Sequence, residues 1–123
     1  MATLKITRIS TILGCALLVI MALFHGSGIN YISDLMQQSD AEPFLKEIFP
    51  VLFAHPSLQL FGLAGLGIVT LFMKQEIGKI LCFIAIMVCV DSLLAFSLGA
   101  IIPGILLIIA SLLFVLGAIK HLR

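Results

Sequence analysis

The most constraining feature of the sequence is an apolar run over residues 80–97 that carries one acid, Asp91. A helix over this run would rise about 27 Å, which is close to the roughly 30 Å hydrocarbon core of a bilayer. A carboxylate at such a depth is costly, so acids in membrane helices usually face other protein or a water-filled cavity. The run therefore predicts a transmembrane helix, and any chemistry of the chain should involve Asp91.

The composition is that of a chain whose solvent is lipid, because 62% of its 123 residues are hydrophobic and only 11% are charged. Soluble domains are about half apolar and a quarter charged. We predict a single all-α membrane domain in which four transmembrane helices form an antiparallel up-down bundle. The predicted helices cover about residues 9–25, 54–73, 80–97 and 101–119.

A polar outer segment over residues 26–50 separates the first two predicted membrane helices. Apolar residues recur at helical spacing from Ile29 to Met36, which is typical of an amphipathic helix on a membrane surface. Glu42 and Pro43 fit the first turn of a second short helix. We therefore expect a short extracytoplasmic helical hairpin, either packed on the bundle and its headgroups or covering a pocket as a lid.

Two prolines follow this segment, Pro50 and Pro56. Each removes a backbone donor and disfavours helix in the residue before it. The second membrane helix is therefore expected to start near Pro56, with His55 near its cap. A kinked helix that starts nearer Pro50 is the alternative.

The distribution of positive charge predicts the orientation. Six of the seven Lys and Arg residues fall on one side of the predicted helices, and only Lys46 falls on the other. The positive-inside rule then places both termini in the cytoplasm and residues 26–50 outside. We expect a multi-pass protein of a bacterial inner membrane with no nucleic-acid partner, because no basic cluster is present. The six inner residues are Lys5, Arg8, Lys74, Lys79, Lys120 and Arg123.

Polar side chains of the outer half form the candidate intramembrane site. At about 1.5 Å per residue, Asp91 lies roughly 18 Å and Gln59 roughly 21 Å from the cytoplasmic helix ends. His55 lies one helical turn beyond Gln59 on the same face. We expect these groups to meet in one pocket that opens outward if the helices turn them inward. The candidate residues are His25, His55, Gln59, Asp91 and Ser92.

Two interpretations of this site remain open. In the first, Asp91 is protonated or hydrogen-bonded to Gln59 or Ser92 and joins two helices. In the second, Asp91 titrates and exchanges a proton or binds a cation, with His55 linking it to the outside. His25, His55 and Asp91 include no close-spaced ligand pair, so we expect no metal. We also expect no cofactor and assign no catalytic residue.

Small residues predict where helices approach one another closely. Gly62 and Gly65 thin the middle of the second membrane helix, where a tight neighbour is expected. Cys82, Ala85 and Cys89 share one arc of the third helix with Ser92. The cysteines at 15, 82 and 89 are interpreted as small apolar packing residues. The hydroxyls of Ser10, Thr11 and Ser111 are expected to bond back to their own helices.

These observations favour a non-enzymatic membrane protein of structural or interaction type. Its partners would be the lipid bilayer and either a second copy or a larger membrane complex. One alternative is a small ion- or proton-coupled transporter that uses Asp91. A second is a lipid- or quinone-binding module, or a membrane enzyme, with an outward-facing pocket under the 26–50 segment.

Overall fold

The computed structural model describes residues 2–119 and 121, and it is helical throughout apart from short connections. The described residues contain no β-strand. Four segments are long and apolar enough to cross a membrane, which confirms the all-helical class and the four candidate spans. The helices are α1 (Ala2–Ser27), α2 (Ile29–Gln38), α3 (Pro43–Thr70), α4 (Ile77–Ser97) and α5 (Ile101–Ile119).

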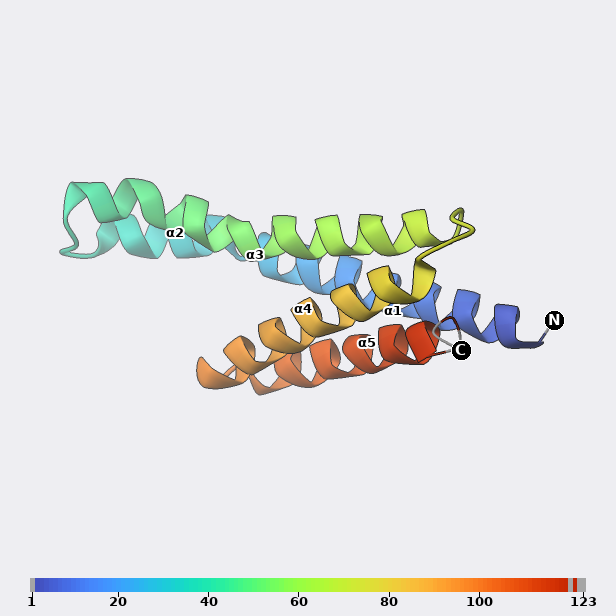
Figure 1. The fold of residues 1–123 in the computed structure, drawn as a ribbon. Helices are drawn as coiled ribbons and strands as arrows, with labels where there is room; N and C mark the ends of the chain where they lie inside the picture. The colour runs from blue at the N-terminus through green and yellow to red at the C-terminus, as the bar shows by residue number, and fades with distance from the viewer. Residues whose placement is uncertain (1, 120, 122–123) are drawn as a thin grey trace.

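The long helices pack in the order α3, α1, α5, α4, because α1 lies against both α3 and α5 while α4 lies mainly against α5. α3 and α4 contact each other far less, although they follow each other in the sequence. Figure 1 shows why: α4 starts beside the end of α3 and then diverges from it. α1 begins and α5 ends at the end of the molecule that carries the α3–α4 connection.

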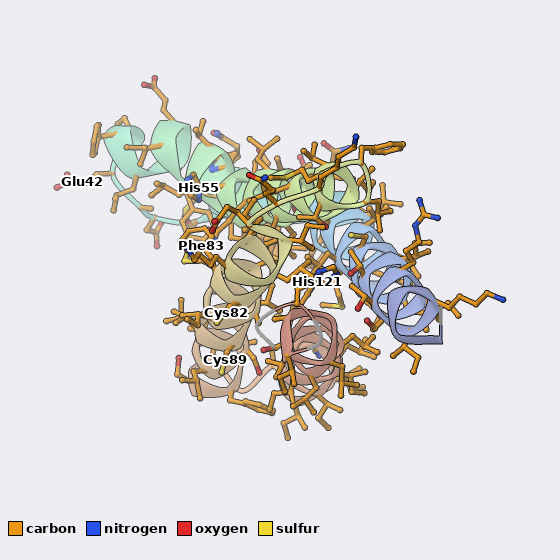
Figure 2. The ribbon with its side chains drawn as sticks, turned by 45° about the vertical axis from the view of Figure 1, so that its right-hand side comes forward. Glu42, His55, Cys82, Phe83, Cys89 and His121 are labelled. Carbon is orange, nitrogen blue, oxygen red and sulfur yellow. The ribbon has the colours of Figure 1, made fainter. Side chains whose placement is uncertain are left out.

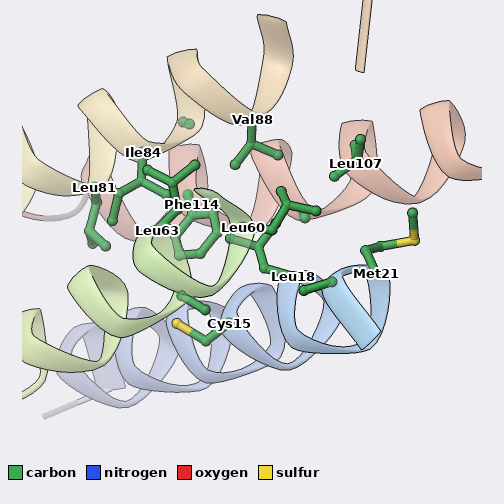
Figure 3. Close-up of a cluster of buried hydrophobic side chains, with 14 of the residues drawn as sticks. Cys15, Leu18, Met21, Leu60, Leu63, Leu81, Ile84, Val88, Leu107 and Phe114 are labelled. Atoms are coloured by element: carbon green, nitrogen blue, oxygen red, sulfur yellow. The ribbon is translucent and has the colours of Figure 1, made fainter. Parts of the chain in front are cut away.

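A single apolar core joins the four long helices (Figure 3). Phe114 of α5 is fully buried at its centre. A Cβ atom on Gly14 would lie 2.9 Å from the Phe114 ring, and one on Gly67 would lie 2.6 Å from the Cys15 Sγ atom. Glycine at these two positions lets α1 and α3 close on the ring, and the buried Cys15 packs there as a small apolar residue.

The start of α3 differs from the expected start near residue 54. α3 begins at Pro43 and continues through Pro50 and Pro56 to Thr70. Each proline removes one helix bond, but neighbouring helices can stabilise such a break in a membrane helix. α2 packs along the first half of α3, and the Lys46 ammonium donates a hydrogen bond to the Gln37 carbonyl at 3.0 Å. These contacts hold a segment that the prolines alone would leave irregular.

The outer segment is also more helical than expected. α1 continues to Ser27, and α2 follows after the single residue Gly28. The Gly28 N–H donates to the His25 carbonyl at 3.2 Å, and the Ile32 N–H donates to the Gly28 carbonyl at 3.0 Å. α2 thus continues the course of α1, and the α2–α3 hairpin extends beyond the α4–α5 hairpin (Figure 1). It stands along the helix axes and does not fold over the ends of α4 and α5 as a lid.

Candidate functional site

The polar pair Gln59–Asp91 joins α3 to α4, the two long helices that otherwise contact each other little. The Gln59 Nε2 atom donates to both carboxylate oxygens of Asp91, at 3.2 Å each. Both side chains are half-buried. Of the five candidate residues, these are the two whose side chains the structure brings together.

His25 makes a separate contact between α1 and α3. Its Nδ1 atom shares a hydrogen bond of 3.1 Å with the Ser57 hydroxyl. Its ring also stacks on Phe53, with ring centroids 4.3 Å apart and an interplanar angle of 20°. Phe53 and Ser57 are one turn apart on α3, so they form one wall for the imidazole. No pattern in the sequence indicates either residue as a partner of His25.

Ser92 bonds to α5 and not to Asp91. Its hydroxyl is fully buried and donates to the Gly104 carbonyl at 2.7 Å. Ser111 was expected to bond back to its own helix, but its hydroxyl donates instead to the Ala85 carbonyl of α4 at 2.8 Å. Two buried hydroxyl–carbonyl bonds thus fasten α4 to α5 along their shared face.

His55 is exposed and lies one turn before Gln59 on α3 (Figure 2). The five candidate residues are therefore distributed over three separate interhelical contacts and one exposed position, and they do not line one pocket. Within residues 2–119 and 121, no three His, Cys, Asp or Glu side chains are placed so that they could hold a metal ion.

The predicted packing residues divide between core and surface. Ala85 is buried, Cys82 is half-buried and Cys89 is exposed (Figure 2). The three residues therefore do not form one buried packing surface on α4. Gly62 and Gly65 are exposed, and a Cβ atom on either would meet no heavy atom within 4 Å. Among the described residues, Gly62 and Gly65 have no tight neighbour, whereas Gly67 packs against Cys15 and Phe114.

A cavity that was not expected from the sequence lies at the end of the molecule that carries the α3–α4 connection. It has a volume of about 250 Å³. Ser10 bonds back to the Thr7 carbonyl at 3.0 Å, as expected. The Thr11 hydroxyl does not bond in this way, because it is buried with no hydrogen-bond partner. The cavity is lined by Thr7, Arg8, Thr11, Thr70, Leu71, Met73, Ile77 and His121.

The sequence carries a partial signal for this cavity. Thr7 and Thr11 are four residues apart on one face of α1, and Arg8 follows Thr7 in the sequence. Nothing in the sequence indicates that the end of α3 and the start of α4 complete the same cavity. Comparisons of the chain with protein-family models, with curated proteins and with solved structures find no match.

Proposed function

We propose that the chain is a small, non-enzymatic, multi-pass membrane protein that associates with a second copy of itself through the α3–α4 side. The four candidate spans would form an up-down bundle in a bacterial inner membrane, with the α2–α3 hairpin outside. Lys5, Arg8, Lys74 and Lys79 support this orientation, because they belong to the end of the molecule opposite that hairpin. Lys120 and Arg123, which belong to the same argument, lie outside the described residues.

The observation that carries the proposal is the half-buried Gln59–Asp91 pair beside an exposed glycine. His55, Gln59 and Gly62 recur at spacings of four and three, so they share one face of α3. We call these three residues, together with Asp91, the α3–α4 face. An ionised carboxyl has about four acceptor sites, and the single Nε2 donor of Gln59 leaves acceptor capacity on Asp91.

A carboxylate that faces lipid with acceptor sites unoccupied favours contact with a helix of another molecule. Polar groups in a membrane are stabilised by hydrogen bonds between helices, and glycine lets two backbones approach closely. The α3–α4 face is also self-complementary, because Gln59 has a second amide hydrogen to donate and Asp91 can accept it from another copy. A two-fold contact would use the same face on both chains.

The test is self-association in bilayers, measured by energy transfer between donor- and acceptor-labelled copies as the lipid-to-protein ratio rises. Gly62→Leu should remove the transfer, because its side chain fills the space that a second helix needs. It should not disturb the monomer, because a Cβ atom there meets nothing within 4 Å.

The matched control is Ala16→Leu, which adds similar bulk at an exposed position of α1 and should leave the transfer unchanged. Two results would refute association through this face. In the first, energy transfer in the unsubstituted protein falls on dilution with lipid as random proximity predicts. In the second, the transfer persists in Gly62→Leu.

The transporter alternative is favoured by one observation, which is that the protein itself encloses only about half of the Asp91 side chain. Asp91→Asn separates the two proposals. The asparagine keeps an acceptor for Gln59 and should preserve self-association, whereas a proton-coupled carrier would lose its activity with the ionisable group.

A further inference from the structure

A row of mostly exposed residues continues the α3–α4 face along α3 toward the tip of the α2–α3 hairpin. Within this row Phe44 is 66% exposed, and Val51 and Leu58 are each 68% exposed. Ile48 is half-buried. The row also includes two residues of the α3–α4 face itself. We call it the α3 seam, and it consists of Phe44, Ile48, Val51, His55, Leu58 and Gly62.

The residues of the α3 seam recur at alternating spacings of four and three. This is the heptad pattern, which places one row of side chains against a partner helix in a left-handed coiled coil. Ile48 and His55 occupy one core position of the heptad, and Leu58 occupies the other. A β-branched residue at the first position with leucine at the second favours two strands, and a single polar residue at the first position fixes the register. The pattern therefore fits a two-stranded contact.

The α2 helix packs on the side of α3 that is opposite the α3 seam. The Lys46 ammonium bonds to the Gln37 carbonyl of α2 at 3.0 Å. Phe44 and Ile48 are two residues from Lys46 in either direction, which is about 200° round the helix. At the other end of the seam, a Cβ atom on Gly62 would meet no heavy atom within 4 Å. The described chain thus leaves the α3 seam largely open.

The outer end of the α3 seam extends past the end of α4. α4 has 21 residues and rises about 31 Å, which is close to the roughly 30 Å hydrocarbon core of a bilayer. α3 has 28 residues and rises about 42 Å, and Figure 1 shows its first part beyond the α4–α5 hairpin. Phe44 and Ile48 belong to this extra length, where lipid that surrounds α4 does not cover them. Apolar side chains exposed outside lipid indicate contact with protein.

A second copy of the chain matches this surface. The same distribution of positive charge orients every copy alike, so the α3 helices of two copies run parallel, and a two-fold axis brings each seam residue against its own counterpart. Of the positions that flank the seam, Glu47 alone is charged, and in a parallel pair it faces Leu52 of the other copy. Contact therefore brings no like charges together. The flanking positions are Leu45, Glu47, Leu52, Ala54, Gln59 and Phe61.

We propose that the α3 seam is the contact surface for a second copy, and that two α3 helices pair in parallel and in register from Gly62 out to Phe44. This inference rests on the proposed self-association and extends its surface from the membrane into the α2–α3 hairpin. The hairpin then has a role in assembly, because its apolar side chains lengthen the contact beyond the bilayer.

The first experiment is disulfide cross-linking of the full chain in native membranes, in a background that keeps only the buried Cys15. Phe44→Cys reports on the outer end of the seam, and Gly62→Cys reports on the part within the membrane. The matched control is Tyr31→Cys, because Tyr31 is an aromatic residue of the same hairpin that is 67% exposed but lies on α2. On mild oxidation the two seam variants should form a dimer, and Tyr31→Cys should form at least tenfold less.

The second experiment measures how strongly the outer end contributes. Phe44→Gln and Tyr31→Gln are compared by energy transfer between labelled copies as the lipid-to-protein ratio rises. Phe44→Gln should weaken association by tenfold or more, because it removes an apolar side chain from the contact, and Tyr31→Gln should change it less than twofold. Both variants should keep the helix content of the protein, because both side chains are mostly exposed.

The outcomes separate this inference from the self-association on which it rests. A dimer from Gly62→Cys with none from Phe44→Cys would overturn the α3 seam and leave association through the α3–α4 face intact. No dimer from either variant would overturn both. Equal dimer from Phe44→Cys and Tyr31→Cys would indicate random collision of hairpins and would overturn the seam, as would unchanged energy transfer in Phe44→Gln.

Discussion

Polar residues join α4 to α5 and α3 to α4, but in different surroundings. Between α4 and α5, Ser92 and Ser111 are buried and make short bonds to backbone carbonyls. Between α3 and α4, Gln59 and Asp91 are half-buried, and their bond is longer, at 3.2 Å. The Ser92 and Ser111 hydroxyls both donate to a carbonyl of the same chain. Asp91, by contrast, can accept further hydrogen bonds, and it lies beside the exposed Gly62. A polar residue in a membrane helix therefore has to be judged by its surroundings as well as by its depth.

The largest expected effect comes from adding volume on the closed side of α3. Gly67→Leu should lower the free energy of unfolding by about 1–3 kcal/mol, as overpacking of a core does, because a Cβ atom there lies 2.6 Å from the Cys15 Sγ atom. Unfolding in mixed micelles of increasing denaturing-detergent content measures it. Gly65→Leu, at an exposed position of the same helix outside the α3–α4 face, is the control and should unfold like the unsubstituted protein. Equal destabilisation by both would contradict the division of α3 into a closed and an open side.

A smaller effect is expected where α4 meets α5. Ser92→Ala removes the bond to the Gly104 carbonyl, and interhelical bonds of this kind contribute about 0.6 kcal/mol on average and up to about 1.7. Burial of Ser92 favours the upper part of that range. The same unfolding titration measures the loss, and exposed Ser97→Ala is the control. A Ser92→Ala protein as stable as the control would show that this bond does not hold the two helices.

The smallest effect on stability is expected at Asp91. Asp91→Asn keeps the shape and one acceptor oxygen for Gln59, so the free energy of unfolding should change by about 0.6 kcal/mol or less. Gln59→Leu, which removes the donor, is the comparison variant for the same titration. A loss several times larger in Asp91→Asn would mean that the charge itself stabilises the monomer, and the α3–α4 face would then resemble the α4–α5 contact.

The fold could be predicted from the sequence wherever hydropathy decides it. The predicted run 101–119 coincides with α5, and the run 80–97 lies within α4, which starts at Ile77. The start of α3 could not be predicted in this way. Pro50 and Pro56 predicted a break in the helix, because each lacks a backbone N–H donor. In the structure α3 is continuous through both prolines, and its first part packs against α2.

The same distinction applies to the candidate site, of which only part could be predicted from the sequence. The contact of Gln59 with Asp91 could be expected from their similar depth in two helices predicted to run in opposite directions. Ser92 bonds instead to a backbone carbonyl of α5, and no residue pattern marks which carbonyl is nearby. The placement of His25 against Phe53 and Ser57, and the cavity beside Thr11, depend on helix rotation and on chain ends that come together only in the fold.

The most direct test of association through the α3–α4 face is disulfide cross-linking between copies in native membranes. Gly62→Cys is compared with Ala16→Cys in a protein whose Cys82 and Cys89 are replaced by alanine, while the buried Cys15 is kept. We expect mild oxidation to give a cross-linked dimer from the cysteine at 62 and none from that at 16. A dimer from position 16 with none from position 62 would contradict association through this face.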